Sequence, residues 1–282
     1  MGAEIKRRDS TGNAPFFKVT NLSCGYGRGN FALKGIDLSV GKGEFYGILG
    51  RNGSGKSTLF KGICGDIRTF EGSITLGGRS LLDMPAKEKA RCIAVVSQFA
   101  EVAPITVEEY VLMGRTPYRT KFSFSYSSND YAIAAKYMNL TGISQLSGKL
   151  ITEISGGERQ MASIASALAQ EPQLLLLDEP TSHLDIYYQI KIMDLLQSLN
   201  REENLTVVMI LHDLNLAGEY CTGLSIMKEG VLKYTGTPAQ ILTWEKIEDA
   251  YGTPVITGEN PVSGKPCVYT LSKSTINRSI KP

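Results

Sequence analysis

The chain has 282 residues, 42% of them hydrophobic, and its formal net charge is only +2. A chain of this size can bury one large core, and its near-neutral charge argues against a nucleic-acid-binding protein, which usually presents a strongly basic face. The five cysteines are scattered and form no C-x-x-C pair, which argues against a disulfide framework or a zinc site. The apolar runs are much shorter than the roughly 20 residues that span a bilayer, so we expect the chain not to cross a membrane.

The first part of the chain has the pattern of short strands. Residues 16–20, 31–40 and 73–76 are predicted strands, and the partial alternation within 31–40 suits a half-exposed antiparallel sheet. Residues 45–49 form a continuous apolar run, which is typical of a strand buried on both faces. A glycine-rich loop follows, and residues 56–64 are predicted to be a helix.

The pattern changes between residues 99 and 150, where strand signals vanish and residues 107–113 and 131–140 are predicted helices. We interpret this region as a helical insertion in an α/β domain. Around it we predict strands at 93–97, 174–178, 207–211, 224–227 and 231–234, and helices at 157–169, 186–200 and 214–220. The helix 186–200 is predicted to carry one apolar stripe of Ile186, Ile190, Met193, Leu196 and Leu199.

These patterns divide the chain into three parts. We predict an N-terminal tail (1–15), a main domain (16–252) with a helical subdomain at about 99–155, and a C-terminal extension (253–282). The extension shows little pattern beyond residues 255–256 and 268–269.

Residues 50–58 read GRNGSGKST and match the phosphate-loop pattern G-x-x-x-x-G-K-[ST]. Glycines let the backbone wrap closely around phosphates, and the positive end of the following helix points at the same place. Lys56 is expected to reach the β- and γ-phosphates, and the Ser57 hydroxyl to bind Mg²⁺. The residues predicted to bind nucleotide here are Gly50, Asn52, Gly53, Ser54, Gly55, Lys56, Ser57 and Thr58.

Residues 174–180 read LLLLDEP, a buried strand that ends in two carboxylates. In parallel α/β sheets, ligands bind at the carboxyl ends of the strands. Asp178 is therefore predicted to hold Mg²⁺, directly or through water, and Glu179 to orient or deprotonate the attacking water.

Residues 154–160 read ISGGERQ and lie just before a predicted helix. Ser155 can cap that helix, while Gly156 and Gly157 expose backbone N–H groups, which makes a second anion cradle. One nucleotide does not need two cradles within one subunit, so we interpret this one as serving the ATP held by another copy of the chain.

This motif resembles the LSGGQ or LSGGE hallmark of the ABC ATPase family, with Ile154 in place of the usual Leu, and the other motifs occur in the family's order. The resemblance implies a P-loop ABC ATPase fold with a RecA-like parallel sheet core, an N-terminal antiparallel β subdomain and a helical insertion. It also implies ATP and Mg²⁺ as ligands.

By the same resemblance, Tyr26 would stack on adenine, and Gln98 would be the Q-loop glutamine that touches Mg²⁺ and water. Asp185 would belong to the D-loop, in which His183 stands where Ala is common, and we expect His183 to contact the partner subunit. His212 would bind the γ-phosphate and position the water. The implied catalytic residues are Glu179, His212 and Gln98, and the implied metal ligands are Ser57, Gln98 and Asp178.

The residues 179–186, 211–216 and 236–243 resemble the ATPases of iron–siderophore, haem and cobalamin importers, as do 251–255 and 261–266. The resemblance implies a homodimer at the cytoplasmic face of the cell membrane, bound to separate permease subunits and served indirectly by an extracytoplasmic substrate-binding protein. A molybdate or tungstate importer shares much of this pattern.

The motifs also bear on two further classes of protein. A non-transport ABC ATPase usually carries two ATPase units in one chain or a long coiled-coil insert, and the sequence shows neither. A P-loop kinase or GTPase would not need the second cradle at residues 155–157. The sequence therefore favours an importer ATPase over both of these classes.

Overall fold

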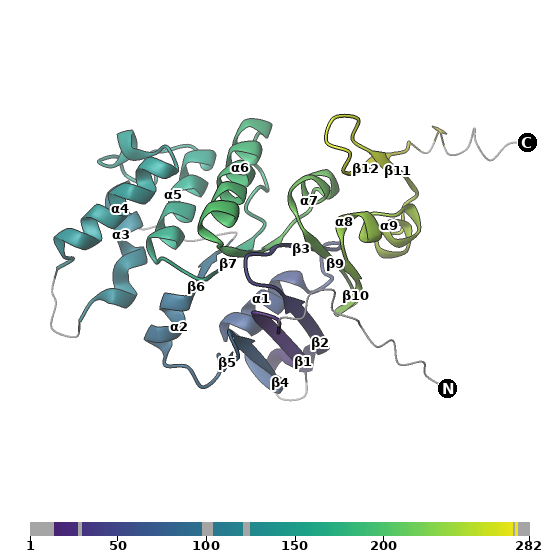
Figure 1. The fold of residues 1–282 in the computed structure, drawn as a ribbon, viewed down its shortest axis with the longest axis horizontal. Helices are drawn as coiled ribbons and strands as arrows, with labels where there is room; N and C mark the ends of the chain where they lie inside the picture. Colours follow the sequence, from purple (N-terminus) through teal and green to yellow (C-terminus); the bar gives the residue numbers. More distant parts are fainter. Residues whose placement is uncertain (1–13, 28–29, 98–103, 121–124, 273, 276–282) are drawn as a thin grey trace, which may run out of the picture.

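The computed structural model describes residues 14–27, 30–97, 104–120, 125–272 and 274–275, which are built around a six-stranded sheet (Figure 1). The strand order is β10-β9-β3-β8-β7-β6. The first strand, β10, is antiparallel to β9, and the other neighbours are parallel. The strands are β3 (Phe45–Leu49), β6 (Ile93–Val96), β7 (Leu174–Asp178), β8 (Thr206–Ile210), β9 (Gly223–Lys228) and β10 (Val231–Gly236).

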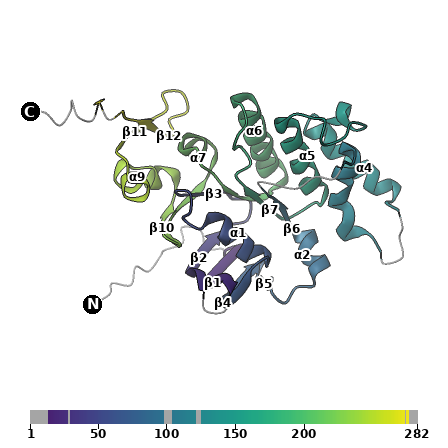
Figure 2. The ribbon, with the colours of Figure 1, turned by 180° about the vertical axis from the view of Figure 1, so that it is seen from behind.

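The central strands are buried on both faces, as their continuous apolar runs predict. Along β7, Leu174 and Leu176 belong to one hydrophobic cluster, and Leu175 and Leu177 belong to another on the opposite face. The first face is covered by helix α1 (Lys56–Cys64), which lies between this sheet and a second one (Figure 2). Helix α6 (Ile186–Glu203) and helix α7 (Leu214–Tyr220) cover the other face.

The second sheet is antiparallel, with the order β2-β1-β4-β5, and confirms the predicted N-terminal β region. Its strands are β1 (Phe17–Gly27), β2 (Asn30–Val40), β4 (Arg68–Leu76) and β5 (Arg79–Ser80). Strands β1 and β4 are longer than predicted because their outer halves pair through the backbone, irrespective of the side-chain pattern.

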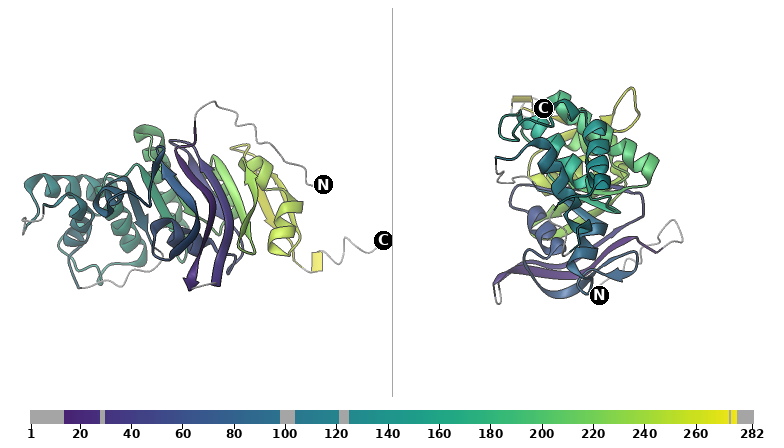
Figure 3. Two further views of the ribbon diagram at one scale, coloured as in Figure 1. Left: turned by 90° about the horizontal axis from the view of Figure 1, so that it is seen from below. Right: turned by 90° about the vertical axis from the view of Figure 1, so that its left-hand side faces the viewer.

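One end of the molecule is made mainly of helices (Figure 3). They are α3 (Val107–Leu112), the 3₁₀ turn η1 (Met113–Tyr118), α4 (Ser128–Leu140), the 3₁₀ turn η2 (Ser144–Leu146) and α5 (Gly156–Ala169). Helices α3 and α4 lie in the predicted insertion and pack against α5. The exact limits of the tail, the helical subdomain and the C-terminal extension stay predictions.

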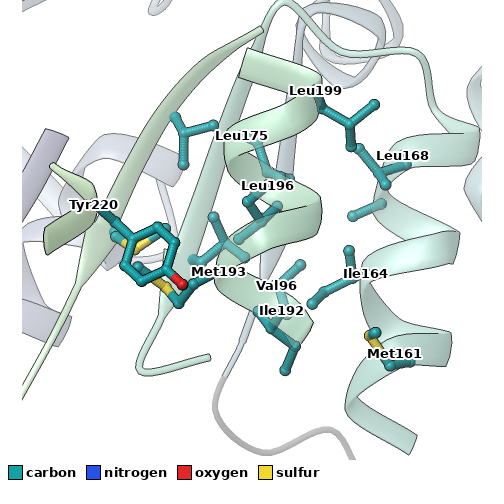
Figure 4. Packing of buried hydrophobic residues seen from close by; sticks show 14 of the residues in the cluster. Val96, Met161, Ile164, Leu168, Leu175, Ile192, Met193, Leu196, Leu199 and Tyr220 are labelled. Atoms are coloured by element: carbon teal, nitrogen blue, oxygen red, sulfur yellow. The ribbon is translucent and has the colours of Figure 1, made fainter. Parts of the chain in front are cut away.

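The predicted stripe on α6 is wrong in its first turns. Ile186 is 76% exposed and Ile190 is 38% exposed. The buried face begins one turn later, and Figure 4 shows it against β7 and α5. It is made of Ile192, Met193, Leu196 and Leu199. Periodicity identified a helix, but which turns face the sheet depends on how far the helix extends beyond it.

Several elements carry no strong sequence signal. These are α2 (Ala86–Cys92), α8 (Pro238–Ile241), α9 (Trp244–Tyr251) and the hairpin of β11 (Val255–Glu259) with β12 (Pro266–Thr270). The two short patterns at 255–256 and 268–269 belong to this hairpin. Within the described ranges, every helix is too short or too polar to pass through a bilayer.

A buried arginine connects the helices at the insertion end. Arg115 is 3% exposed and donates hydrogen bonds to Asp130 Oδ1 at 3.1 Å, to the Ala169 carbonyl oxygen at 2.7 Å and to Glu171 at 2.8 Å. Burial would raise the pKa of Asp130, but hydrogen bonds from Ser127 and from Arg115 hold it below its ordinary value. Arg115 thus ties η1 to the start of α4 and the end of α5.

We expect Arg115→Leu to lower the free energy of unfolding by about 3–5 kcal/mol, because it leaves the buried carboxylate of Asp130 without its cationic partner. Lys136→Ala is the matched control, since it breaks an exposed ion pair with Glu203 and should cost less than about 1 kcal/mol. Urea unfolding measures both changes. Equal, small losses in the two variants would contradict a structural role for Arg115.

Candidate functional site

Three adjacent strands carry the predicted chemistry to one edge of the sheet. In the observed register, Ile48 of β3 lies beside Ile210 of β8, and Ile210 lies beside Asp178 of β7. Gly50 and His212 follow these isoleucines by two residues, and Glu179 follows Asp178 directly. Because the strands are parallel, all of their carboxyl ends open on the same cleft.

The loop after β3 has a backbone that requires glycine. Gly50 has φ +146° and Gly55 has φ +107°. A Cβ on Gly50 would lie 2.3 Å from the Met227 carbonyl oxygen, and one on Gly55 would lie 2.6 Å from Leu33 Cδ2. Among the residues that the structure describes, no side chain caps the first turn of α1, so its backbone N–H groups are available to an anion.

Lys56 is the buried cation of this loop, with 5% of its surface exposed. Its ammonium donates hydrogen bonds to the Gly50 and Arg51 carbonyl oxygens at 2.8 and 3.1 Å. Burial lowers the pKa of Lys56, and the negative charges of Glu179 and Asp178 oppose that shift. A phosphate would supply the further negative charge that this ammonium can bind.

Ser57 and Asp178 form an oxygen pair suited to a hard cation. The Ser57 hydroxyl donates to Asp178 Oδ1 at 3.3 Å. Burial raises the pKa of Asp178, and the Ser57 hydrogen bond partly offsets that rise. Hydroxyl and carboxylate oxygens are ligands that Mg²⁺ accepts alongside phosphate and water, so the residues present fit this ion.

Oε1 of Glu179 contacts Nε2 of His212, and the Glu179 carboxylate accepts a hydrogen bond from the Ser182 hydroxyl at 3.2 Å. Glu179 has φ +55° and His183 has φ +63°. Such left-handed backbone in a non-glycine residue is costly, and it persists where the surrounding structure fixes it, commonly at functional sites. The turn after β7 therefore holds the Glu179 carboxylate against the imidazole of His212, which follows β8.

These groups border a cleft of about 650 Å³. Its lining residues are Asn52, Gly53, Gly55, Lys56, Ser57, Thr58, Glu179, Ser182, His183 and His212. Asp178 lines an adjoining hollow of about 310 Å³, and Ser57 lines both. Gln98, predicted to be a catalytic residue and metal ligand, lies outside the described residues.

The other predicted binding residues are not among those that line the cleft. Tyr26 is 67% exposed, with the Lys61 ammonium 6.0 Å from its ring centroid. Gly50 and Ser54 belong to the loop backbone behind the cleft wall. The hydroxyl of Ser54 is buried and has no hydrogen-bond partner within the described part of the chain.

Ser155 and Asp185 act as helix caps. Ser155 caps α5 and forms a reciprocal pair with Glu158, whose pKa the hydrogen bonds from Ser155 hold below its ordinary value. Asp185 caps α6 by accepting from the Tyr188 N–H at 2.9 Å. Gly157 lies against the Tyr188 ring, because a Cβ added to Gly157 would lie 2.3 Å from Tyr188 Cδ2. The residues of the predicted second cradle lie at a helix N-terminus, separate from the cleft lining, and their binding of an anion stays a prediction.

Sequence reasoning missed the contacts of Ser182 and Tyr251. The Gly50 N–H donates a hydrogen bond to the Tyr251 hydroxyl at 2.9 Å. Tyr251 lies 201 positions further along the chain, so no local pattern pointed to this contact. Ser182 sits within the D-loop stretch, and its spacing of three from Glu179 is the signal that could have identified it.

The family model and the similar proteins all point to one protein family. Residues 33–182 match the ABC transporter family. The chain is 40% identical over 267 residues to YvrA of Bacillus subtilis (strain 168), an uncharacterized ABC transporter ATP-binding protein, covering 94% of this chain but 60% of YvrA. It is 38% identical over 254 residues to the ferric enterobactin transport ATP-binding protein FepC of Escherichia coli (strain K12), covering 90% and 93%. The hemin import ATP-binding protein HmuV of Gloeobacter violaceus is 36% identical over 256 residues, covering 88% and 92%.

Two solved structures are also similar. One is an inward-facing conformation of a proposed metal-chelate type ABC transporter, with 29% identity, a TM-score of 0.80, and coverage of 93% of this chain and 99% of that one. The other is a dimeric structure of a bacterial ABC transporter cassette, with 29% identity, a TM-score of 0.69, and coverage of 79% and 98%.

We expect Gly50→Ala to destabilise the protein by more than roughly 2 kcal/mol, because its Cβ would strike a backbone oxygen in addition to the cost of a left-handed φ. Gly264→Ala is the matched control, since Gly264 has φ +68° and open space around its Cβ position. It should cost only about 1 kcal/mol. Thermal and urea unfolding compare the two, and similar losses would argue against a close-packed loop.

Proposed function

Because this chain belongs to the ABC transporter family, we propose that it is the ATP-hydrolysing subunit of an importer. The single observation that carries the proposal is the cleft at the ends of β3, β8 and β7. There a phosphate-binding loop, Glu179 and a histidine line one hollow, and Asp178 lies beside it in hydrogen-bond contact with Ser57. Phosphoryl transfer to water needs charge stabilisation and a positioned water, and these side chains supply both.

Lys56 and the N–H groups at the start of α1 would bind the phosphates of ATP. Ser57 and Asp178 would hold Mg²⁺, which, when bound, neutralises charge on the phosphates. Glu179 would accept the proton of the attacking water as general base. His212, in contact with Glu179, would orient that carboxylate and the water beside it. Gln98 would approach the same site, and Tyr26 would offer its exposed ring to the adenine.

We further propose that two copies share their sites. Ser155, Gly156 and Gly157 lie at a helix N-terminus that does not line the chain's own cleft, and such an end can bind an anion. A head-to-tail partner would bring this cradle to the γ-phosphate, with Asp185 and His183 at the contact between the subunits. The dimeric structure of a related cassette supports this arrangement.

The transported cargo is proposed to be a metal chelate such as a ferric siderophore or haem, with cobalamin in the same group. The support is the transport role carried in the names of the relatives FepC and HmuV. Separate permease subunits would hold the chain at the cytoplasmic face of the membrane, and an extracytoplasmic binding protein would deliver the cargo. Molybdate or tungstate is the second candidate cargo, because importers of these anions share much of the same sequence pattern.

We expect Glu179→Gln to bind ATP normally and to lower hydrolysis by at least about 100-fold, because an amide cannot accept the proton of the attacking water. The variant should accumulate as an ATP-bound dimer, seen by light scattering after size exclusion with MgATP. Glu203→Gln, an exposed change on α6, is the control and should behave as wild type. A monomeric Glu179→Gln protein with MgATP would refute the proposal.

Ser155→Arg should abolish hydrolysis while leaving ATP affinity nearly unchanged, because the cradle serves the partner's nucleotide. Mixing this variant with Lys56→Ala provides the sharper test. In a mixed dimer with shared sites, one site carries both defects and the other is intact, so activity should return to at most about a quarter of wild type.

If each chain used its own cradle, no mixture could recover activity. Ser127→Arg is the matched control, since it removes the same kind of capping box from α4 without altering the cradle. It should keep hydrolysis close to wild type.

A further inference from the structure

The C-terminal part of the chain forms a hydrogen bond with the first residue of the phosphate-binding loop. Tyr251 is the last residue of α9, and its hydroxyl accepts the hydrogen bond from the Gly50 N–H at 2.9 Å. Burial raises the pKa of Tyr251 to about 12, so the hydroxyl stays protonated at neutral pH. Neither Gly50 nor Tyr251 is among the residues that line the cleft.

Gly50 connects Tyr251 to the cation of the site. Its carbonyl oxygen accepts a hydrogen bond from Lys56 Nζ at 2.8 Å, while its N–H is bound by Tyr251. On its third side, the Met227 carbonyl oxygen leaves no room even for a Cβ. A single residue therefore stands between the tyrosine hydroxyl and the ammonium that is expected to meet the phosphates.

Helix α9 is itself anchored to the strands beside the loop. Lys228 Nζ donates to the Asp249 carbonyl oxygen at 2.8 Å and to its Oδ1 at 3.1 Å, and Lys233 donates to Oδ2 at 2.7 Å. The turn between β9 and β10 then binds the loop, because the Gly230 N–H donates to the Ser54 carbonyl oxygen at 3.0 Å. The loop is thus supported at both ends by one connected unit.

We propose that Tyr251 is a positioning residue for nucleotide binding, which acts through Gly50 to fix the place of Lys56. This makes the C-terminal helix a working part of the nucleotide site. The inference rests on the proposed function in that ATP is the ligand. Removing the hydroxyl would leave the Gly50 N–H without its partner and free the loop to relax before ATP binds.

The test is Tyr251→Phe, which keeps the ring and removes the hydroxyl alone. The dissociation constant of ATP should rise by about two- to twelvefold, the effect of losing one ordinary hydrogen bond. The KM for ATP should rise in parallel while kcat changes little, because Glu179 and His212 are held by other contacts. Calorimetric titration with ATP and steady-state hydrolysis measure the two quantities.

Tyr269→Phe is the control, since this tyrosine lies partly exposed in the C-terminal hairpin, and it should leave both quantities unchanged. A Tyr251→Phe protein with a lower Tm but an unchanged dissociation constant would show a merely structural role and overturn the inference. If the wild-type chain binds ATP without hydrolysing it, the proposed function fails, yet the binding titration still decides the role of Tyr251.

Discussion

The parallel pairing of β3 with β8, and of β8 with β7, is the constraint on which the site depends. It sets Ile48, Ile210 and Asp178 side by side, so that the loop, the histidine and the acidic pair leave the sheet together. Alternate residues of a strand face opposite sides, so a slip of one residue would turn each of these groups to the wrong face.

Burial and charge are balanced within the cleft. Burial lowers the pKa of Lys56 and raises that of Asp178, and the opposite charges of the two residues counteract both shifts. The ammonium is further held by two carbonyl oxygens of its own loop. Opposite charges and dipoles fixed in this way need little rearrangement when a charged ligand binds, which is the basis of electrostatic preorganisation.

Helix N-termini with the same kind of capping box differ in their capacity to bind an anion. The N-termini of α3, α4 and α5 each carry a capping box, yet only α5 combines it with two adjacent glycines. Without side chains beyond the backbone at these glycines, the first N–H groups of α5 can approach an anion closely. At the opposite end of the molecule, α9 reaches back to the first glycine of the phosphate-binding loop.

The sequence by itself determined the α/β class, the antiparallel N-terminal sheet and the buried strands, and its motifs named Lys56, Asp178 and Glu179 as candidate site residues, with His212 added by the family resemblance. These follow from local periodicity and short motifs, which need only neighbouring residues. Only the tertiary structure decided that the first turns of α6 are exposed, that Arg115 binds helices together, and that Tyr251 supports Gly50. Such contacts join residues far apart in the chain, and their geometry is fixed by the packing of whole elements.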